Sequence, residues 1–216
     1  MCLTAAVAAD WVNLPRAAEP RAQQPSSHTA SPVRVVVMGV SGSGKSALAS
    51  RLALALGAEF VEGDELHPRR NVDLMAAGIA LTDDDRHGWL HAIAEQLFQA
   101  RLHGRSIVIS CSALKRRYRD LLRLGAADTR FIHLHGSAEL LSERLGQRAG
   151  HYMPASLLPS QLLALEAPDA DEGALSLGIE APVERLLEIA LSALSAATAP
   201  AAATSMPSTS SNSPTP

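Results

Sequence analysis

Short apolar runs recur along the central part of the chain. The run VRVVVMG, residues 33–39, is rich in β-branched residues and predicts a central strand that is buried on both faces. RSIVISC (105–111) and RFIHLHG (130–136) predict further strands. Shorter stretches at 58–62 and 174–179 complete the predicted set of strands.

The stretches between these runs place apolar residues at helical spacing. Leu48, Leu52 and Leu56 lie four residues apart and predict a helix over 45–56, which Gly57 closes. A capping box at Thr82–Asp85 predicts a long helix that ends at about residue 103. Further helices are predicted at 68–77, 114–124, 137–148, 154–166 and 181–195. Strands that alternate with helices indicate βαβ units, so the sequence predicts an α/β fold with a parallel sheet covered on both faces.

The two ends of the chain differ from the middle in composition. Residues 1–32 are rich in alanine and punctuated by proline, and from about Ala197 the chain is rich in alanine, serine, threonine and proline and carries no charge. Such segments cannot bury enough apolar surface to order themselves. We therefore expect a disordered extension over 1–32, a folded domain over 33–196 and a disordered tail over 197–216.

Composition and charge exclude several classes of protein. A chain of 216 residues with 47% hydrophobic content is long enough for one domain with a sizeable core. Its formal charge of −3 gives no basic surface for nucleic acid or an anionic membrane, and no apolar run approaches the length of a membrane span. Two cysteines build no disulfide framework, which favours the reducing cytoplasm.

A glycine-rich octapeptide joins the first strand to the first helix. It matches the phosphate-loop pattern G-x-x-x-x-G-K-[ST] at every position: Gly39, Val40, Ser41, Gly42, Ser43, Gly44, Lys45 and Ser46. Such a loop turns backbone N–H groups toward phosphate oxygens, Lys45 places a cation between the β- and γ-phosphates, and the Ser46 hydroxyl is a ligand for Mg²⁺. The alternative is a connecting turn, but the strand before and the helix after favour a nucleoside triphosphate site.

A second polar group follows the strand at 58–62. Ligands of doubly wound sheets lie beyond the carboxyl ends of the strands, where Asp64 falls. A carboxylate there can orient a substrate hydroxyl and take its proton during attack on phosphorus, whereas the structural alternative is a helix N-cap. His67 and Asn71 lie one helical turn apart, so both are candidates to contact the same ligand.

Five stretches together carry a family resemblance. They are GVSGSGKS (39–46), GDELHPRRN (63–71), MAAGIALTDDDRHGWL (75–90), CSALKRRYRDLLR (111–123) and GHYMPASLLPSQLLALEAPDADE (150–172). In this order they resemble the gluconokinases, small P-loop sugar-acid kinases related to shikimate and adenylate kinases. The resemblance covers nearly all of 33–196. It implies a three-layer NMP-kinase-like fold with a helical lid, and Mg²⁺- and ATP-dependent phosphorylation of D-gluconate to 6-phospho-D-gluconate by a homodimer.

The chain departs from the family pattern at three positions. Leu74 stands where the family commonly has lysine, and Ala80 and Gly88 stand where prolines are usual. Leu74 removes one possible phosphate contact, while the other two changes affect loop stiffness. None of the three changes the implied reaction class.

An anionic polyol such as gluconate calls for cations in its site. Arg86, in the first turn of the capped helix, is one candidate. Lys115 and Arg119, four residues apart beyond the strand at 105–111, are two more. The structural alternative for all three is a solvated surface.

Basic residues near the predicted lid form the last candidate group. In relatives of this fold, arginines of the lid close on the phosphates and exclude water, a role that the resemblance extends to Arg144 and Arg148. His151 lies in the adjoining family motif and is a further candidate for substrate contact. The alternative for the arginines is a pair of exposed helix charges near Glu139 and Glu143.

Two rival functions remain at this point. A P-loop switch protein should show a strand that ends in aspartate or an N-K-x-D motif, but the strand at 105–111 ends in Ser110 and Cys111 and the motif is absent. Among kinases, the alternative is phosphorylation of shikimate or a nucleoside monophosphate.

Overall fold

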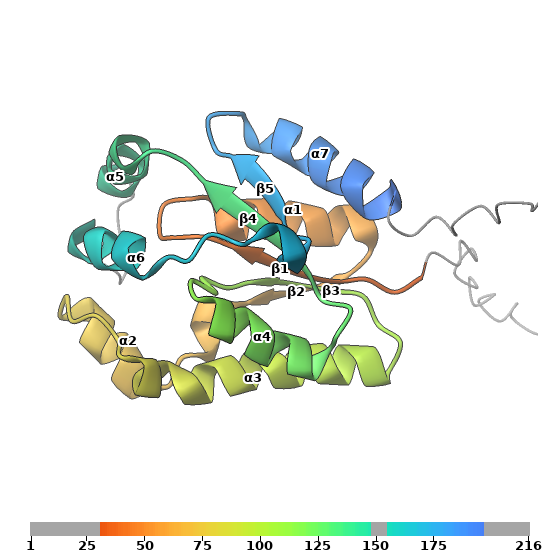
Figure 1. The fold of residues 1–216 in the computed structure, drawn as a ribbon, viewed down its shortest axis with the longest axis horizontal. Coiled ribbons are helices and arrows are strands. Elements are labelled where there is room, and N and C mark those ends of the chain that lie inside the picture. Colours follow the sequence, from red (N-terminus) through yellow and green to blue (C-terminus); the bar gives the residue numbers. More distant parts are fainter. Residues whose placement is uncertain (1–30, 148–154, 197–216) are drawn as a thin grey trace, which may run out of the picture. The chain divides into compact units, whose positions relative to one another are not determined.

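A parallel five-stranded sheet forms the centre of the fold. The computed structural model describes residues 31–147 and 155–196. The strands lie in the order β2–β3–β1–β4–β5, and each neighbouring pair is parallel (Figure 1). They are β1 (Arg34–Met38), β2 (Glu59–Glu62), β3 (Ile107–Ser110), β4 (Arg130–His135) and β5 (Leu175–Gly178). The predicted α/β class and parallel sheet are confirmed.

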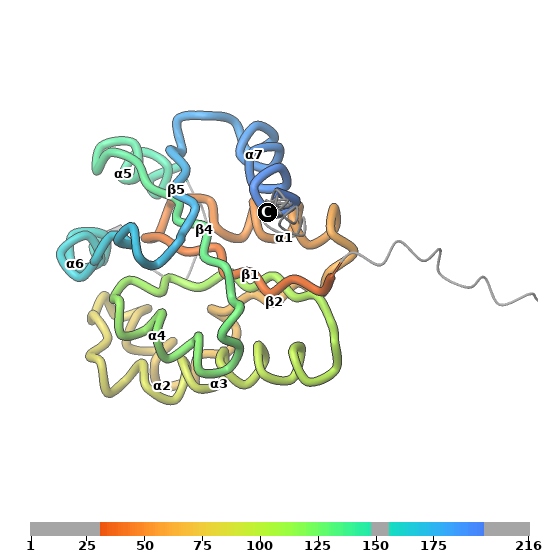
Figure 2. The backbone as a smooth tube through the Cα atoms, turned by 45° about the vertical axis from the view of Figure 1, so that its right-hand side comes forward, coloured from red at the N-terminus to blue at the C-terminus, as the bar shows by residue number. Residues whose placement is uncertain are grey.

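Helices cover both faces of this sheet. One face packs against α1 (Lys45–Leu56) and α7 (Val183–Ala196), and the other against α3 (Asp83–Leu102) and α4 (Arg116–Gly125). The helices α2 (Arg69–Ala76), α5 (Ala138–Gly146) and α6 (Leu158–Ala164) gather beyond the carboxyl ends of the strands (Figures 1 and 2). Three short 3₁₀ helices complete the list: η1 (Gly63–Leu66), η2 (Ala155–Leu157) and η3 (Ala170–Glu172). Within the described ranges, none of the helices has the length and apolar character that a membrane crossing requires.

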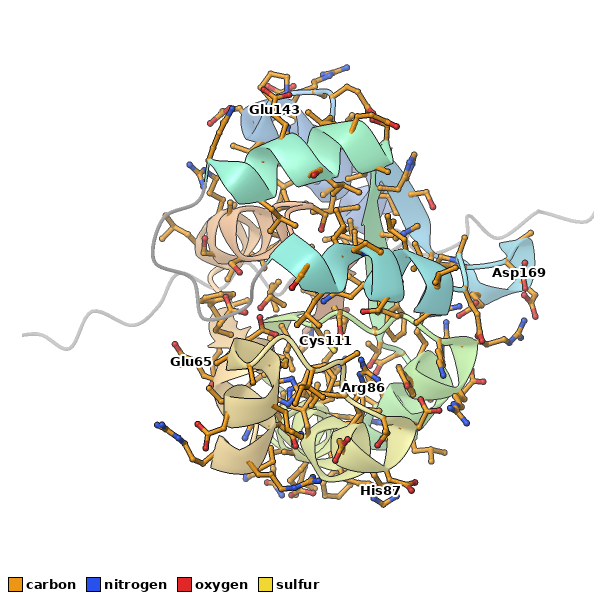
Figure 3. All side chains as sticks on the ribbon, turned by 90° about the vertical axis from the view of Figure 1, so that its left-hand side faces the viewer. Glu65, Arg86, His87, Cys111, Glu143 and Asp169 are labelled. Atoms are coloured by element: carbon orange, nitrogen blue, oxygen red, sulfur yellow. The ribbon has the colours of Figure 1, made fainter. Side chains whose placement is uncertain are left out.

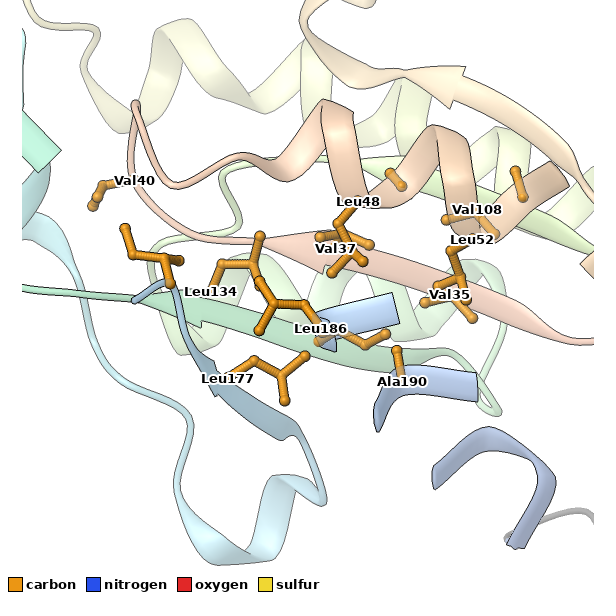
Figure 4. Close-up of a cluster of buried hydrophobic side chains, with 14 of the residues drawn as sticks. Val35, Val37, Val40, Leu48, Leu52, Val108, Leu134, Leu177, Leu186 and Ala190 are labelled. Atoms are coloured by element: carbon orange, nitrogen blue, oxygen red, sulfur yellow. The ribbon is translucent and has the colours of Figure 1, made fainter. Parts of the chain in front are cut away.

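The strand β1 divides the core into two layers because its alternate residues face opposite sides. Val35 and Val37 join the cluster under α1 and α7, part of which Figure 4 shows, whereas Val36 and Met38 join the cluster under α3 and α4. All four side chains are fully buried, and burial of each stabilises the fold by about 1.5–3 kcal/mol. The loop that leaves β1 therefore starts from a firmly held strand.

Caps fix where the site-bearing helices begin and end. Thr82 Oγ1 accepts a hydrogen bond from the Asp85 N–H at 3.2 Å, and the Asp85 carboxylate accepts one from the Thr82 N–H at 2.9 Å. The predicted capping box is thus confirmed, and it fixes the first turn of α3. The predicted helix-ending glycine is confirmed as well, because Gly57 has the left-handed φ of 59°.

Other boundaries differ from the sequence-based expectation. The helix predicted to start at Leu114 begins at Arg116 instead, because Ala113 has a φ of 41° and Lys115 is extended. The helix predicted over 154–166 is regular only from Leu158, after the 3₁₀ turn η2. Both differences lie in loops beyond strand ends, where backbone direction is set by tertiary contacts.

Some expectations concern residues outside the described ranges. These are the proposed disorder of most of 1–32 and of 197–216, and the roles given to Arg148 and His151. The helical lid also stays a prediction, since α5 and α6 are described but residues 148–154 between them are not.

Candidate active site

The octapeptide between β1 and α1 has the backbone conformation of a phosphate-binding loop. Gly39, Gly42 and Gly44 have positive φ angles of 142°, 82° and 88°, which residues with a Cβ rarely adopt. A Cβ on Gly39 would lie 2.5 Å from the carbonyl oxygen of Leu134, so glycine is also required by space. The loop is tied to β3 because the Gly39 N–H donates to the Ser112 carbonyl at 3.3 Å.

A cleft of about 710 Å³ opens beside this loop. Its lining residues are Ser41, Gly42, Gly44, Lys45, Ser46, Ala47, Glu62, Asp64, Glu65, Val72 and Arg144. The Lys45 ammonium donates to the Val40 carbonyl at 3.1 Å and so lies over the loop. Ser43 Oγ is buried without a hydrogen-bond partner among the described residues. Of the predicted octapeptide, Gly39, Val40 and Ser43 do not line the cleft, but they shape the loop that forms it. Backbone N–H groups, a lysine and a helix N-terminus in one cleft fit the phosphates of a nucleotide.

The same cleft offers oxygen donors that fit Mg²⁺. The Ser46 hydroxyl lines the cleft together with the carboxylates of Glu62, Asp64 and Glu65. Hydroxyl and carboxylate oxygens are the donors that Mg²⁺ prefers, and this ion commonly completes its shell with water and substrate phosphates. Among the described residues, no group of three or more His, Cys, Asp or Glu side chains is arranged to hold a metal ion by itself.

A second cavity, of about 30 Å³, adjoins the loop on the side of α2 and α3. It is lined by Ser41, Lys45, Asp64, His67, Met75, Leu81, Arg86, Trp89, Ser112, Leu114 and Gln161. Ser41, Lys45 and Asp64 line both cavities. The two spaces therefore meet at the loop lysine and a carboxylate, which is the arrangement that transfer of a phosphoryl group between two ligands requires.

Close packing around Gly63 holds Asp64 at this junction. A Cβ on Gly63 would lie 2.1 Å from the Ser110 carbonyl oxygen, so a larger residue would push β2 and β3 apart. The Gly63 N–H donates to Ser110 Oγ at 3.3 Å, and the Trp89 indole N–H donates to the Gly63 carbonyl at 2.7 Å. Asp64 follows directly in η1, as the second residue beyond the end of β2, and it is not a helix N-cap in the structure.

His67 is held flat against an aromatic wall of the smaller cavity. Its ring stacks on Trp89 with a centroid distance of 4.1 Å and an interplanar angle of 16°. Burial, and secondarily the nearby charge of Arg86, lowers the pKa of His67 to about 4. The imidazole is therefore neutral at physiological pH.

Arg86 is the cation that the smaller cavity contains besides Lys45, among the described residues. It lies in the first turn of α3, and its Nη1 donates to the Leu81 carbonyl at 2.5 Å. Figure 3 labels Arg86 and Glu65 on the side of the molecule where α2 and α6 face each other. Arg86 thus lines the smaller cavity, and its contact with an anionic substrate stays a prediction.

Asn71 has a different place from the one predicted. Its side chain is buried, with 1% of the residue exposed, and is not among the residues that line either cavity. The Asn71 amide nitrogen donates to the Asp85 carbonyl at 2.7 Å and lies 3.4 Å from His67 Nδ1. Asn71 therefore contacts His67 and α3, and the expected direct contact with the substrate is not supported by its position.

The prediction that Arg119 contacts the substrate is wrong. Its side chain is fully buried and pairs with Glu172 through two hydrogen bonds of 2.5 and 2.6 Å. Its Nη1 also donates to the Glu166 carbonyl at 3.0 Å and the Ala113 carbonyl at 3.2 Å. These bonds join α4 to the chain that precedes β5, so Arg119 has a structural role.

Lys115 and Arg144 lie near the site in different ways. The Lys115 ammonium pairs with the Asp83 carboxylate at 3.0 Å, and Lys115 lines neither cavity. Arg144 lines the phosphate cleft, where its Nη2 also donates to the Ile179 carbonyl at 2.7 Å. Of these two predicted cations, the structure brings only Arg144 to the cavities.

The site contains residues that the sequence reasoning did not single out. Gln161 on α6 lines the smaller cavity, and its Oε1 accepts a hydrogen bond from the Ser41 N–H at 2.7 Å. Gln161 is part of the Ser-Gln pair in the family stretch 150–172, but the sequence does not indicate its hydrogen-bond partner. Trp89 belongs to the buried core and also lines the cavity. Cys111 is fully buried, and burial raises its pKa to about 12.

Fold and loop together define the class of the protein as a P-loop kinase. A family model described as an AAA domain matches residues 35–168. The thermoresistant gluconokinase of Escherichia coli K12 is 47% identical over 150 residues, which are 69% of this chain and 86% of that protein.

Two solved structures are similar along 94% and 100% of their own length. A gluconokinase from Sinorhizobium meliloti 1021 has a TM-score of 0.71 and 46% identity and covers 78% of this chain and 94% of its own. A sugar kinase from Janibacter sp. HTCC2649 has a TM-score of 0.73 and 47% identity, with coverage of 79% and 100%. The chain belongs to the gluconokinase family.

Proposed function

We propose that the protein transfers the γ-phosphoryl group of ATP to D-gluconate and forms 6-phospho-D-gluconate. The observation that carries this proposal is that Ser41, Lys45 and Asp64 border both the phosphate cleft and the smaller cavity. Membership of the gluconokinase family supports gluconate as the acceptor. We further propose that the enzyme acts in the cytoplasm, as a homodimer, and supplies sugar-acid catabolism.

Each ligand has its own set of residues in this proposal. The loop 39–46 binds the phosphates of ATP through its N–H groups and Lys45. Mg²⁺, held by the Ser46 hydroxyl, would neutralise charge on the phosphates. Arg86 pairs with the carboxylate of gluconate and His67 binds one of its hydroxyl groups.

The chemical step needs a base at the junction of the two cavities. Asp64 takes the proton of the attacking gluconate hydroxyl while the oxygen of that hydroxyl forms a bond to the γ-phosphorus. The bond from the γ-phosphorus to the oxygen that bridges it to the β-phosphate breaks at the same time. Lys45 stabilises the negative charge that develops on the transferred group. ADP leaves with the bridging oxygen, and Asp64 returns its proton to solvent.

Exclusion of water is the remaining requirement, because water competes with gluconate for the phosphoryl group. Arg144 reaches the phosphate cleft from α5, beyond which the chain continues toward Arg148 and His151. We assign this segment the role of a lid that closes on bound ATP. Arg148 joins Arg144 at the phosphates and His151 contacts gluconate in this proposal.

A coupled assay of ADP release distinguishes gluconate kinase activity from the rival functions. We expect turnover with gluconate. With shikimate or AMP, we expect ADP release no faster than in a reaction that contains no acceptor. Turnover with AMP or shikimate but not with gluconate would overturn the proposed acceptor. ATP hydrolysis unaffected by any acceptor would instead favour a P-loop switch protein.

Asp64→Asn tests the proposed base. The carboxamide keeps the size of the side chain but cannot take the proton, so we expect kcat to fall by roughly 10²- to 10⁴-fold while ATP binding is nearly unchanged. Steady-state kinetics and titration with a fluorescent ATP analogue measure the two quantities. Asp73→Asn, an exposed position on α2, is the matched control and should retain parental turnover. An Asp64→Asn enzyme with more than about half the parental kcat contradicts the assignment.

A further inference from the structure

The amide of Asn71 has a fixed orientation in the structure. Its nitrogen lies 2.7 Å from the Asp85 carbonyl oxygen, which can only accept a hydrogen bond. The nitrogen of the amide, not its oxygen, must therefore face this carbonyl. The buried position of Asn71 leaves the amide little room to turn.

This orientation determines which nitrogen of His67 carries the proton. The Asn71 amide nitrogen is a donor, and His67 Nδ1 lies 3.4 Å from it. Nδ1 must therefore act as the acceptor and be unprotonated. In a neutral imidazole the single proton then resides on Nε2.

The surroundings of the His67 ring also disfavour a second proton. The ring is stacked on Trp89, and the charged groups that line the same cavity are Arg86 on α3, Lys45 on α1 and Asp64 on η1. On the side of Asn71, the Asp85 carboxylate is engaged by Thr82 and Arg70 and presents only its backbone carbonyl to the amide. Two of the three cavity charges are positive and oppose protonation, in agreement with the lowered pKa of His67.

We propose that Asn71 is a positioning residue that holds His67 as a neutral Nε2–H donor toward the oxygen atoms of the acceptor. The proposal rests on the proposed function and refines it. A ring with Nε2 protonated and Nδ1 occupied cannot remove a proton, so His67 orients the acceptor and the role of base falls to Asp64. The side chain at position 71 therefore acts on acceptor binding without touching the acceptor.

Histidine NMR tests the tautomer without any substrate. Long-range ¹H–¹⁵N spectra of the full-length protein at pH 7 distinguish the two neutral tautomers and the imidazolium, and His67→Gln identifies the His67 signals. We expect the Nε2–H tautomer in the parent protein. A Nδ1–H tautomer or an imidazolium at pH 7 overturns the proposal. Because no acceptor is present, this result does not depend on gluconate being the substrate.

Variants of Asn71 test the positioning role. In Asn71→Asp the carboxylate next to Nδ1 favours the imidazolium, so the midpoint of the His67 NMR titration should rise by at least one pH unit above the parental value. In Asn71→Leu the donor is lost, and we expect the KM for gluconate to rise by roughly tenfold with less change in the KM for ATP. Asp73→Asn on the same helix is the control and should leave both readouts unchanged.

Two outcomes contradict the positioning role. One is an Asn71→Asp protein, shown to be folded by circular dichroism, in which the His67 titration midpoint does not move. The other is an Asn71→Leu enzyme whose KM values for gluconate and ATP rise together, since that result indicates a general loss of structure. Should gluconate prove not to be phosphorylated, the titration of Asn71→Asp still decides the proposal.

Discussion

In the phosphate loop, the backbone conformation determines where the one charged side chain lies. Three glycines set the backbone and leave Lys45 as the charged side chain of the octapeptide. Its ammonium lies over the loop, on the Val40 carbonyl, and borders both cavities. The Lys45 ammonium is therefore placed to stabilise the negative charge of the phosphoryl group throughout its transfer from one ligand to the other.

Lys45→Ala should leave a folded protein in which kcat falls by about 10³-fold or more, because the transition state loses its nearest cation. The change is measured by the coupled assay, with the melting temperature as evidence of folding. Arg51→Ala, on the exposed side of the same helix, controls for the loss of a positive charge from α1. Near-normal turnover in Lys45→Ala rules out the assigned phosphate site.

At the scale of elements, α4 is joined to the chain before β5 by a buried ion pair. Arg119 and Glu172 are both almost completely inaccessible, and hydrogen bonds from Arg119 lower the pKa of Glu172 to about 2. Replacement of Arg119 removes the two short hydrogen bonds of the buried Glu172 carboxylate and leaves it the longer pair with Arg123 at 3.4 Å, which costs more than the net contribution of the intact pair.

Arg119→Met should lower the free energy of unfolding by about 3–5 kcal/mol, as measured by urea denaturation at pH 7. The double variant Arg119→Met/Glu172→Leu should regain a substantial part of this loss, because the buried carboxylate is removed together with its main partner. Arg185→Met, which removes an exposed helix pair, is the control and should change stability by less than about 1 kcal/mol. A loss below about 1 kcal/mol in Arg119→Met would show that the pair is unimportant for the fold.

The same ion pair shows why some of the site was not predictable. The phosphate loop and the capping box are local patterns, in which each residue finds its partners within a few positions, and the structure confirms both as conformations. Arg119 finds its partner 53 positions away, and its sequence neighbours look like a basic, solvated helix face. Gln161 and Ser41 are separated by 120 positions. Sequence reasoning therefore anticipated the order of strands and helices well, and erred where long-range contacts decide burial.

For the molecule as a whole, the buried histidines set the response of stability to acid. His133 on β4 is 4% exposed, and its Nε2 has no hydrogen-bond partner among the described residues. Burial, followed by the charges of His135 and Arg119, lowers its pKa to about 4. Since the ordinary value is near 6.5, the unfolded chain binds this proton more readily.

The contribution of His133 to the free energy of unfolding should accordingly be constant above pH 6.5 and fall as the pH decreases from 6.5 to 4. Below pH 4 this contribution should change no further. The deficit is on the order of 2 kcal/mol at pH 5, or roughly 4–8 °C in Tm. His133→Phe should reduce the difference in Tm between pH 7.5 and pH 5 by that amount. His67 titrates in the same range, so His67→Gln serves as the comparison. An unchanged pH profile in His133→Phe contradicts the assignment.

The acceptor pocket draws most of its walls from one continuous piece of chain. Asp64, His67, Met75, Leu81, Arg86 and Trp89 all lie between the end of β2 and the second turn of α3. In the sequence, the phosphate loop precedes this piece, and the strands β2 and β3 of the sheet flank it on either side. A substitution at His67, Met75, Leu81, Arg86 or Trp89 can therefore reshape the acceptor pocket without changing a residue that lines the phosphate cleft. In evolutionary terms, a lineage of such kinases can change its acceptor through this one segment, and a laboratory can attempt the same by grafting the segment between relatives while Asp64 is kept.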